Sequence, residues 1–389
     1  MNKSLQKLVG IAGKKERSIV GMMSGTSADG LDIVWCRISG HGKQTRFSIE
    51  QFLTMPWPSG LKERLIRQIH TQQVRPLDIC VLHTELGKLF GRMLLDAFQK
   101  WGIGAEQIDL IASHGHTFYH APAAGFSGKP FHATMQLADG DHIAHATDLI
   151  TISDFRQRDT ARGRQGAPLA GYADRLLFSS DKATRIMLNM GGIANFSVIK
   201  KGPDDSEVLS YDTGPGNTLL DAVVRKYYPG ETFDKGGEKA SGGKIDHTLL
   251  KRLKSHPYFS MKPPRSTGFE VFNIQWVEQC MDEEEVHPAP EDLLATLTRL
   301  TVETIAEEIR RAVPVHHPIE VFVSGGGVHN KTMMDGLQRE LQPYPVQSLD
   351  VLGVSADAKE GLLFAVLANE LICGENPECH FGKISFPDK

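Results

Sequence analysis

The chain has 389 residues, of which 40% are hydrophobic and 23% are charged, and its formal net charge is −4. This composition excludes a disordered or low-complexity chain, and the slightly negative charge argues against a nucleic-acid-binding surface. A single hydrophobic core stops growing at about 250–300 residues, so two packed lobes are expected.

Short apolar segments rich in β-branched residues recur between glycines and have the length of strands. They lie at residues 18–23, 31–38, 108–112, 149–153, 185–190, 195–199, 208–211 and 319–323. Helical spacing of apolar residues predicts helices over 293–305 and 356–372, so the chain is predicted to be an α/β protein. Segments 122–131 and 229–243 are rich in Gly and Pro and are predicted to be exposed loops.

Two strand–turn–strand units resemble each other, one near the N-terminus (18–38) and one in mid-chain (185–199). A hairpin that restarts a sheet in mid-chain predicts a duplicated architecture with two related lobes. We place the lobes at residues 1–180 and 181–389, with a last helix able to pack back on the first lobe.

The five cysteines are odd in number and form no Cys-x-x-Cys pair. They predict neither a disulfide framework nor a zinc site, and they favour a reducing compartment. The basic N-terminal segment has an apolar stretch broken by Gly10 and Gly13, unlike a secretory signal. No run approaches the roughly 18 apolar residues of a membrane span. We therefore expect a soluble cytoplasmic protein without a membrane partner.

The first motif with chemical meaning is the turn Ser24-Gly-Thr-Ser-Ala-Asp-Gly30, between two predicted strands. Its backbone N–H groups and hydroxyls suit an anion, and its glycines let the backbone come close to one. Asp29 or Asp32 could hold the waters of a Mg²⁺ ion. The alternative is a polar hairpin turn without a ligand.

The second motif, Tyr211-Asp-Thr-Gly-Pro-Gly-Asn217, follows a predicted strand and precedes a helical pattern. Such a turn can cradle an anion, and Asp212 could act there as a general base. The alternative is that Asp212 only caps the turn.

The third motif, Ser324-Gly-Gly-Gly-Val-His-Asn330, also follows a strand, and its glycines would let a flat ligand or phosphates approach the backbone. Two further polar clusters, 113–117 and 154–168, end predicted strands, where α/β proteins bind ligands. The second cluster carries four arginines suited to a carboxylate or phosphate, although a solvated loop is its alternative. His114 and His116 alone fall short of a metal-ligand set.

The order of these motifs makes the sequence resemble the anhydro-N-acetylmuramic acid kinases, of the acetate kinase/hexokinase/Hsp70/actin superfamily. The resemblance runs from about residue 20 to residue 371. Its markers are Gly-Met-Met-Ser-Gly-Thr-Ser-Ala-Asp-Gly-Leu-Asp (21–32), Ser-His-Gly-His-Thr (113–117), Ser-Asp-Phe-Arg (153–156), Gln-Gly-Ala-Pro-Leu (165–169), Leu-Asn-Met-Gly-Gly-Ile-Ala-Asn (188–195), Asp-Thr-Gly-Pro-Gly-Asn (212–217), Lys-Pro-Pro-Arg-Ser-Thr-Gly (262–268), Gly-Gly-Gly-Val-His-Asn (325–330) and Ala-Asp-Ala-Lys-Glu (356–360).

The resemblance implies a two-lobe, actin-like (ribonuclease H-like) fold with ATP in a central cleft. It implies that water opens the 1,6-anhydro ring of anhydro-N-acetylmuramic acid while O6 takes the γ-phosphoryl group of ATP, in the recycling of cell-wall sugars. Mg²⁺ is implied with ATP, and a homodimer is an expectation at the level of the family.

Residue roles follow from the same resemblance. Asp212 matches the catalytic aspartate that activates water, and Glu360 is a second catalytic candidate, unless it only favours the start of its helix. The implied ATP-binding residues are Ser24, Gly25, Thr26, Ser27, Ala28, Asp29, Gly30, Leu31, Gly214, Gly216, Asn217, Ser324, Gly325, Gly326, Gly327 and Asn330, with Asp29 holding Mg²⁺ through water. The sugar and its lactyl carboxylate are assigned to His114, Thr117, Asp154, Arg156 and Gln165.

The chain departs from the family pattern at two positions on the sugar side. His116 replaces the glutamine of Ser-His-Gly-Gln-Thr, and Arg164 replaces the second glycine of Gly-Gly-Gln-Gly-Ala-Pro. These departures keep open a kinase of the same fold for another anhydrosugar or amino sugar. A non-catalytic ATP-binding switch and a Ser113–His114 hydrolase are rival classes. The absence of a Gly-x-Ser-x-Gly elbow argues against the hydrolase.

Overall fold

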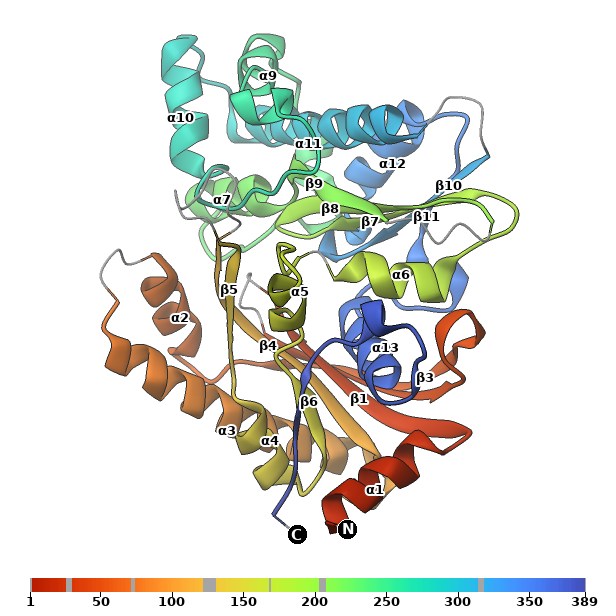
Figure 1. Cartoon of the computed structure of the whole chain (residues 1–389). Helices are drawn as coiled ribbons and strands as arrows, with labels where there is room; N and C mark the ends of the chain where they lie inside the picture. The colour runs from red at the N-terminus through yellow and green to blue at the C-terminus, as the bar shows by residue number, and fades with distance from the viewer. Residues whose placement is uncertain are drawn as a thin grey trace. The chain divides into compact units, whose positions relative to one another are not determined.

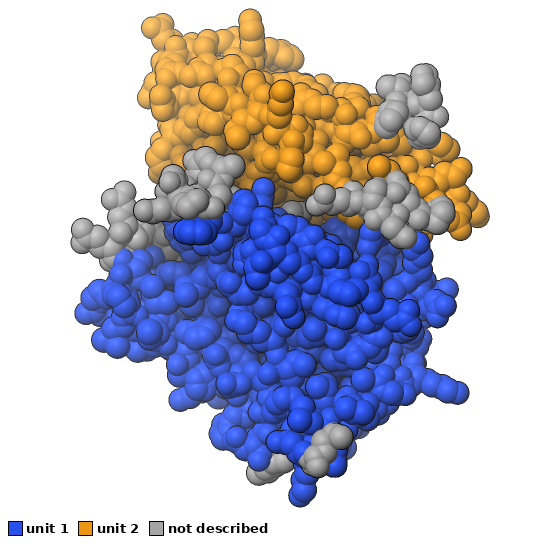
Figure 2. Space-filling view, in the orientation of Figure 1, with its two compact units in different colours: residues 1–177, 358–389 blue, residues 178–357 orange. Residues whose placement is uncertain are grey.

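The computed structural model describes residues 2–25, 30–70, 74–121, 131–167, 169–202, 208–313 and 318–388. The chain divides into two compact units, which Figure 2 distinguishes by colour. Unit 1 comprises residues 1–177 and 358–389, and unit 2 comprises residues 178–357. None of the described helices has the length and apolar composition needed to cross a membrane.

Unit 1 is built on a mixed sheet to which seven strands contribute in the described part of the chain (Figure 1). Its strands are β1 (Glu16–Ser24), β2 (Gly30–Ser39), β3 (Arg46–Pro56), β4 (Leu110–Ala121), β5 (Ala133–Leu137), β6 (Thr151–Ser153) and β12 (Lys383–Ser385). Its α-helices are α1 (Lys3–Ala12), α2 (Leu61–His70), α3 (Pro76–Trp101), α4 (Gly140–Thr147), α5 (Gln157–Ala161), α6 (Ala170–Phe178) and α13 (Lys359–Cys373). Short 3₁₀ turns are η1 (Gly42–Gln44), η2 (Ala105–Gln107) and η7 (Pro377–Cys379).

Unit 2 has a five-stranded mixed sheet within the described residues. Its strands are β7 (Thr184–Met190), β8 (Ile193–Ile199), β9 (Leu209–Pro215), β10 (Ile319–Ser324) and β11 (Val346–Ser348). Its α-helices are α7 (Thr218–Tyr227), α8 (Glu238–Gly242), α9 (His247–Lys254), α10 (Ile274–Glu283), α11 (Pro290–Ala312) and α12 (Lys331–Glu340). The 3₁₀ turns are η3 (Lys235–Gly237), η4 (Pro257–Ser260), η5 (Gly326–His329) and η6 (Leu349–Leu352).

The two sheets share one topology. The strand order is β6-β4-β1-β2-β3 within the first sheet and β11-β10-β7-β8-β9 in the second. In each, the first three strands of the unit form an antiparallel meander. A fourth strand (β4 or β10) pairs in parallel with the first strand of the meander, and a fifth (β6 or β11) pairs in parallel with the fourth. The α/β class and the duplicated architecture predicted from the two hairpins are therefore confirmed.

The strands predicted from apolar runs are present, whereas several neighbouring elements were not predicted. The sequence analysis did not anticipate α3 or β3, and the loop expected over 229–243 contains η3 and α8. The predicted loop at 122–131 lies almost wholly outside the described residues. Strand β3 buries only Met55 fully, and its apolar–polar alternation is broken in the middle, where Glu50 and Gln51 are followed by Phe52 and Leu53. A β-bulge in the pairing with β2 falls at this break, and it interrupts the two-residue period by which a strand is predicted.

The central strands of unit 1 are covered on both faces. Val20 and Met22 belong to the same buried cluster as side chains of α3. On the other face, a Cβ atom at Gly21 would stand 1.9 Å from the carbonyl oxygen of Gly361 in α13. Backbone therefore meets backbone at this contact, and only glycine fits. The contact also places the first turn of α13 beside the β1–β2 hairpin.

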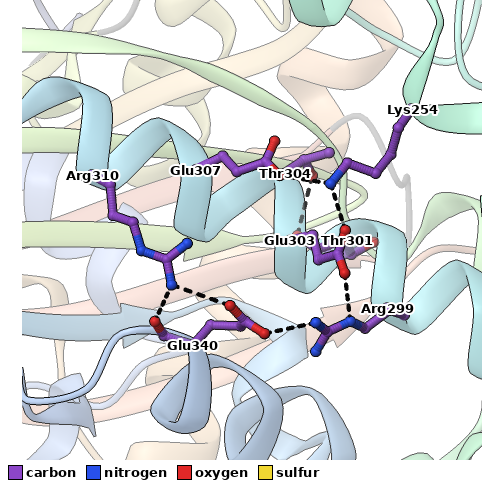
Figure 3. A network of polar contacts seen from close by, with 8 residues as sticks. All are labelled: Lys254, Arg299, Thr301, Glu303, Thr304, Glu307, Arg310 and Glu340. Atoms are coloured by element: carbon purple, nitrogen blue, oxygen red, sulfur yellow. Dashed lines mark hydrogen bonds and ion pairs between the residues drawn. The ribbon is translucent and has the colours of Figure 1, made fainter. Parts of the chain in front are cut away.

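Helix α11 is the main support of unit 2. Its apolar side packs in the core with residues of β7, β8 and β9. Its outer side carries the ion-pair network of Figure 3, in which Glu303 pairs with Arg299 and Lys254, and Glu340 of α12 pairs with Arg299 and Arg310. This network joins α9, α11 and α12. The network therefore fixes α11 relative to α9 and α12.

The backbone contact at Gly21 predicts a specific loss of stability. Gly21→Ala forces β1 and α13 apart, and we expect it to lower the unfolding free energy by about 3 kcal/mol, the upper end of typical overpacking costs. Gly10→Ala is the control, because a Cβ there meets nothing within 4 Å and Ala favours a helix. Thermal and urea unfolding check both variants. Equal stability of the two would contradict a tight β1–α13 contact.

Candidate functional site

In unit 1, the end of the hairpin strand β1 is hydrogen-bonded to a histidine of β4. The Ser24 hydroxyl lies 2.9 Å from Nδ1 of His116, and both side chains are buried. Burial lowers the pKa of His116 to about 4, so the ring is neutral at physiological pH. The residue that departs from the family pattern therefore anchors the start of the phosphate-turn motif.

The neighbouring histidine orients an arginine. Nε of Arg156 donates a hydrogen bond of 2.9 Å to Nε2 of His114, and Nδ1 of His114 lies 3.2 Å from the carbonyl oxygen of Gly115. A ring that accepts at Nε2 must carry its proton at Nδ1, so His114 is neutral. Burial and the Arg156 charge lower the pKa of His114 accordingly. Among the described residues, no hydrogen bond or ion pair engages the two terminal NH₂ groups of Arg156.

Glu360 lies in the first turn of α13, where three other charged groups act on it. Burial raises the pKa of Glu360, the carboxylate of Asp32 raises it further, and Lys359 and Arg156 oppose the rise. Burial lowers the pKa of Arg156 to about 10, and Glu360 counteracts this. Asp32 accepts a hydrogen bond from Thr54, 2.6 Å away. The fold thus brings Asp32, Arg156 and Glu360 into electrostatic contact within one unit.

The other sugar-side residues are placed as follows. Thr117 is partly buried on β4, opposite Gln136 of β5. Asp154 forms an ion pair with Lys383 of β12. Gln165 lies in the turn after α5, next to Gly166, whose N–H donates to Asp159.

Arg164, the second departure from the family pattern, is held by protein carboxylates. Its guanidinium contacts Asp159 at 2.8 Å and Glu378 at 2.6 Å. These partners neutralise its charge within unit 1. Arg164 therefore braces the turn that carries Gln165, which sequence reasoning did not foresee.

The phosphate-turn residues are only partly described. Thr26, Ser27, Ala28 and Asp29 lie outside the described residues. Gly25 follows β1, and Leu31 is fully buried in the core, so only its main chain could reach a ligand. A Cβ at Gly30 would stand 2.6 Å from the carbonyl oxygen of Met55, so this glycine permits close pairing with β3.

Asp212 of β9, in unit 2, is held at three of its atoms by one segment of chain. Its Oδ2 accepts the N–H of Thr267 at 2.9 Å. Its own N–H donates to the carbonyl of Arg265 at 3.0 Å, and its carbonyl accepts the Tyr258 hydroxyl at 2.7 Å. The carboxylate therefore has a fixed position and one strong donor.

The environment of Asp212 raises its pKa to about 7. Burial is the main cause, and the carboxylate of Glu270 adds to it, whereas the Thr267 N–H and the charge of Arg265 lower the pKa. A carboxylate with a pKa near the operating pH is suited to take and return protons. The environment of Asp212 is thus compatible with the general-base role predicted for it.

The turn after Asp212 uses its own amides. The N–H groups of Gly216 and Asn217 donate to the carbonyls of Gly192 and Gly191 at 2.8 and 2.9 Å, and the side-chain amide of Asn217 donates to the Met190 carbonyl at 3.2 Å. Gly214 belongs to the same strand end, beside the ring of Phe259. These groups join β9 to the β7–β8 hairpin, so an anion there would need other donors.

The motif 324–330 meets β7 at the same place. Gly325 has a φ of 80°, and a Cβ there would lie 2.4 Å from the Asn189 side chain. A Cβ at Gly327 would lie 2.6 Å from Met190, whereas one at Gly326 would meet only the Asn217 amide, at 3.7 Å. Gly326 is thus the glycine with room for a ligand.

The side chains of Ser324 and Asn330, the first and last residues of this motif, form hydrogen bonds with the protein backbone. The Ser324 hydroxyl donates to the Leu188 carbonyl at 3.3 Å. The Asn330 side chain caps α12 by accepting the Met333 N–H at 3.0 Å. Both side chains therefore have structural contacts that the sequence analysis did not assign.

Sequence reasoning missed the support of Asp212. Arg265 and Thr267 lie in the motif Lys-Pro-Pro-Arg-Ser-Thr-Gly (262–268), to which the sequence analysis gave no role. They are more than 50 residues from Asp212 in the chain, and no local pattern reveals such a contact. The presence of this motif among the markers of the family resemblance was the signal that could have pointed to a role for Arg265 and Thr267.

Two α/β units with the same sheet topology and polar turns at their strand ends define a protein of duplicated architecture. The family model described as anhydro-N-acetylmuramic acid kinase matches residues 17–380. The chain belongs to this kinase family, and the recognition made from its motifs is confirmed.

Individual relatives carry the same description. The anhydro-N-acetylmuramic acid kinase of Pseudoalteromonas atlantica is 41% identical, with all of both chains covered. Those of Caldanaerobacter subterraneus subsp. tengcongensis and Bacillus thuringiensis subsp. konkukian are 36% and 35% identical, covering 95% and 90% of this chain and 94% and 92% of theirs. Among solved structures, a Schistosoma mansoni hexokinase complexed with glucose matches at 12% identity with a TM-score of 0.40, covering 90% of this chain and 85% of that chain.

The environment of Asp212 predicts its titration. We expect an apparent pKa of about 7 in carboxyl-carbon NMR, with the signal assigned by its loss in Asp212→Asn. Glu270→Gln removes a like charge and should lower this pKa. Glu284→Gln, which removes an exposed carboxylate elsewhere in unit 2, is the control and should leave it unchanged. A pKa near the ordinary value of about 4 would refute the proposed environment.

Proposed function

We propose that this chain is an ATP-dependent kinase that hydrolytically opens the 1,6-anhydro ring of anhydro-N-acetylmuramic acid and phosphorylates O6. The products are N-acetylmuramic acid 6-phosphate and ADP. The single observation that carries the proposal is the carboxylate of Asp212, which is held by the Thr267 N–H and has a pKa of about 7. The family membership names the substrate that this base would serve. We further propose a cytoplasmic location and a role in cell-wall sugar recycling.

The chemistry requires a base and a phosphoryl acceptor at the two ends of one bridge. Asp212 takes a proton from water as the water oxygen bonds to the anomeric carbon C1. The C1–O6 bond breaks, O6 bonds to the γ-phosphorus, and the bond from that phosphorus to the β,γ-bridging oxygen breaks to release ADP. Positioning and charge stabilisation provide most of the acceleration in such transfers.

Arg156 is the proposed partner of the lactyl carboxylate. Its Nε is committed to His114, which fixes the plane of the guanidinium. An arginine fixed in this way can present its terminal NH₂ groups as a bidentate fork to a carboxylate. His114 acts here by orienting Arg156, and Glu360 opposes the fall in the pKa of Arg156 and so helps to keep the buried arginine protonated.

ATP and Mg²⁺ are proposed from the family membership and from the residues at the hairpin. The Ser24–Leu31 turn is the proposed phosphate site, and Gly326 offers uncrowded backbone for the adenosine side. Mg²⁺, when bound, neutralises charge on the phosphates, and it commonly uses one or two carboxylates together with water. Asp32 and Glu360 supply two carboxylates close enough to influence each other, and Asp29 stays the sequence-based candidate.

The base assignment predicts the effect of Asp212→Asn. Turnover should fall about 10²–10⁴-fold, the usual contribution of a general base, while ATP binding measured by calorimetry is retained. In the wild type, activity should rise with pH through about 7, because only the ionised Asp212 accepts a proton. ADP release without any sugar, at the rate seen with sugar, would instead favour an ATP-binding switch.

The carboxylate role of Arg156 predicts selective loss of sugar affinity. Arg156→Lys loses the bidentate fork, so KM for the anhydrosugar should rise about tenfold, with KM for ATP unchanged. The control is Arg158→Lys, an exposed arginine of α5. An anhydro-N-acetylglucosamine substrate lacks the lactyl carboxylate, so Arg156→Lys should barely affect it. An equal loss with both sugars would contradict the assignment.

A further inference from the structure

A buried arginine lies within the segment that holds Asp212. Arg265 has 4% of its surface exposed. Its NH1 donates to the carbonyls of Tyr258, Phe259 and Met261 at 3.0, 3.2 and 2.7 Å. Its guanidinium also lies 4.6 Å from the centre of the Tyr258 ring. One side chain therefore fixes the η4 turn that carries Tyr258.

Glu308 of α11 fixes the arginine in turn. Oε1 of Glu308 lies 3.0 Å from NH2 of Arg265 and 2.7 Å from NH1 of Arg311. Its Oε2 accepts the hydroxyl of Tyr211, the residue that precedes Asp212, at 3.1 Å. Glu308 is 3% exposed, so the charge pair is almost wholly out of water. The support helix is thus linked to Asp212 from two sides.

A buried ion pair of this kind is weak evidence for stability, because desolvating two charges costs as much as their attraction returns. Apolar residues of similar volume could fill the same space. What an apolar pair cannot do is hold three carbonyls of one turn in fixed places. Holding the carbonyls of Tyr258, Phe259 and Met261 in place is therefore enough to explain why a charged pair is buried here.

We propose that Arg265, held by Glu308, and Tyr258 are positioning residues that orient Asp212 for proton abstraction. The inference rests on the proposed function. Tyr258 holds the Asp212 carbonyl, the Arg265 main chain receives the Asp212 N–H, and the Thr267 N–H engages Oδ2. No hydrogen bond from the described residues reaches Oδ1 of Asp212. Oδ1 is then the oxygen presented to the attacking water.

The charged and titratable groups that face Asp212 come from the same surroundings. They are Arg265, whose charge lowers the pKa of Asp212, Glu270, which raises it, and Tyr258, whose own pKa is raised by burial and by Asp212. Glu308 acts on Asp212 through Arg265 and Tyr211. Removing the Arg265 charge should therefore raise the pKa of Asp212.

The first test uses conservative variants that keep the fold. Tyr258→Phe removes only the hydroxyl bonded to the Asp212 carbonyl. Arg265→Lys keeps the charge, but its three N–H donors cannot serve three carbonyls and Glu308 together. We expect kcat to fall about tenfold in each, below the ~100-fold that a 1 Å misplacement can cost, with both KM values within about twofold of wild type.

Matched controls separate positioning from lost stability. Tyr228→Phe removes a hydroxyl that donates to Glu291 at 2.6 Å, and Arg299→Lys alters the outer network of α11 in Figure 3. Both controls should keep wild-type kcat at similar melting temperatures. Equal losses of kcat in test and control variants would overturn the proposal.

The second test is the pH profile. The double variant Arg265→Gln/Glu308→Gln removes both charges of the pair, so neither is left without its partner. In this variant the pH at which kcat reaches half of its maximum on the acid side should be higher than the wild-type value near 7. An unmoved limb, with wild-type kcat in Tyr258→Phe and Arg265→Lys, would overturn the positioning role alone. Near-normal activity of Asp212→Asn would instead overturn the proposed function on which it rests.

Discussion

The constraint on which unit 2 depends is that Asp212 must be shielded from bulk water and still be held in place. Burial raises its pKa, and a single N–H bond to the carboxylate limits that rise. More donors would stabilise the ionised form and weaken it as a base. The segment from Tyr258 to Thr267 meets this constraint by fixing mainly the backbone of Asp212. Helix α11 holds that segment through Glu308.

In unit 1, close packing between two backbone segments brings charged side chains near each other. The contact between Gly21 and Gly361 brings α13 against the hairpin and so places Glu360 near Asp32. A neutral His114 then fixes Arg156 by accepting its Nε–H. The charged arginine is thus oriented by a histidine that burial keeps uncharged.

The glycines of the motifs serve two different purposes. Gly30, Gly325 and Gly327 permit close contact between parts of the protein, whereas Gly326 faces uncrowded space. The amides after Asp212 are likewise used to join β9 to the β7–β8 hairpin. A glycine-rich turn is therefore not an anion site by composition alone. The neighbours of each residue decide which amides are left for a ligand.

The sequence by itself determined the α/β class, the duplicated hairpins and the family, because apolar runs and ordered motifs are local signals, and it predicted a catalytic role for Asp212. It did not reveal that Arg265 and Thr267 support Asp212, or that Glu360 lies near Asp32. It also did not reveal that Arg164 pairs with Asp159 and Glu378. These contacts join distant segments, and burial, which sets the pKa of each group, exists only once those segments are packed. The tertiary structure alone therefore decided the environment that raises the pKa of Asp212 to about 7.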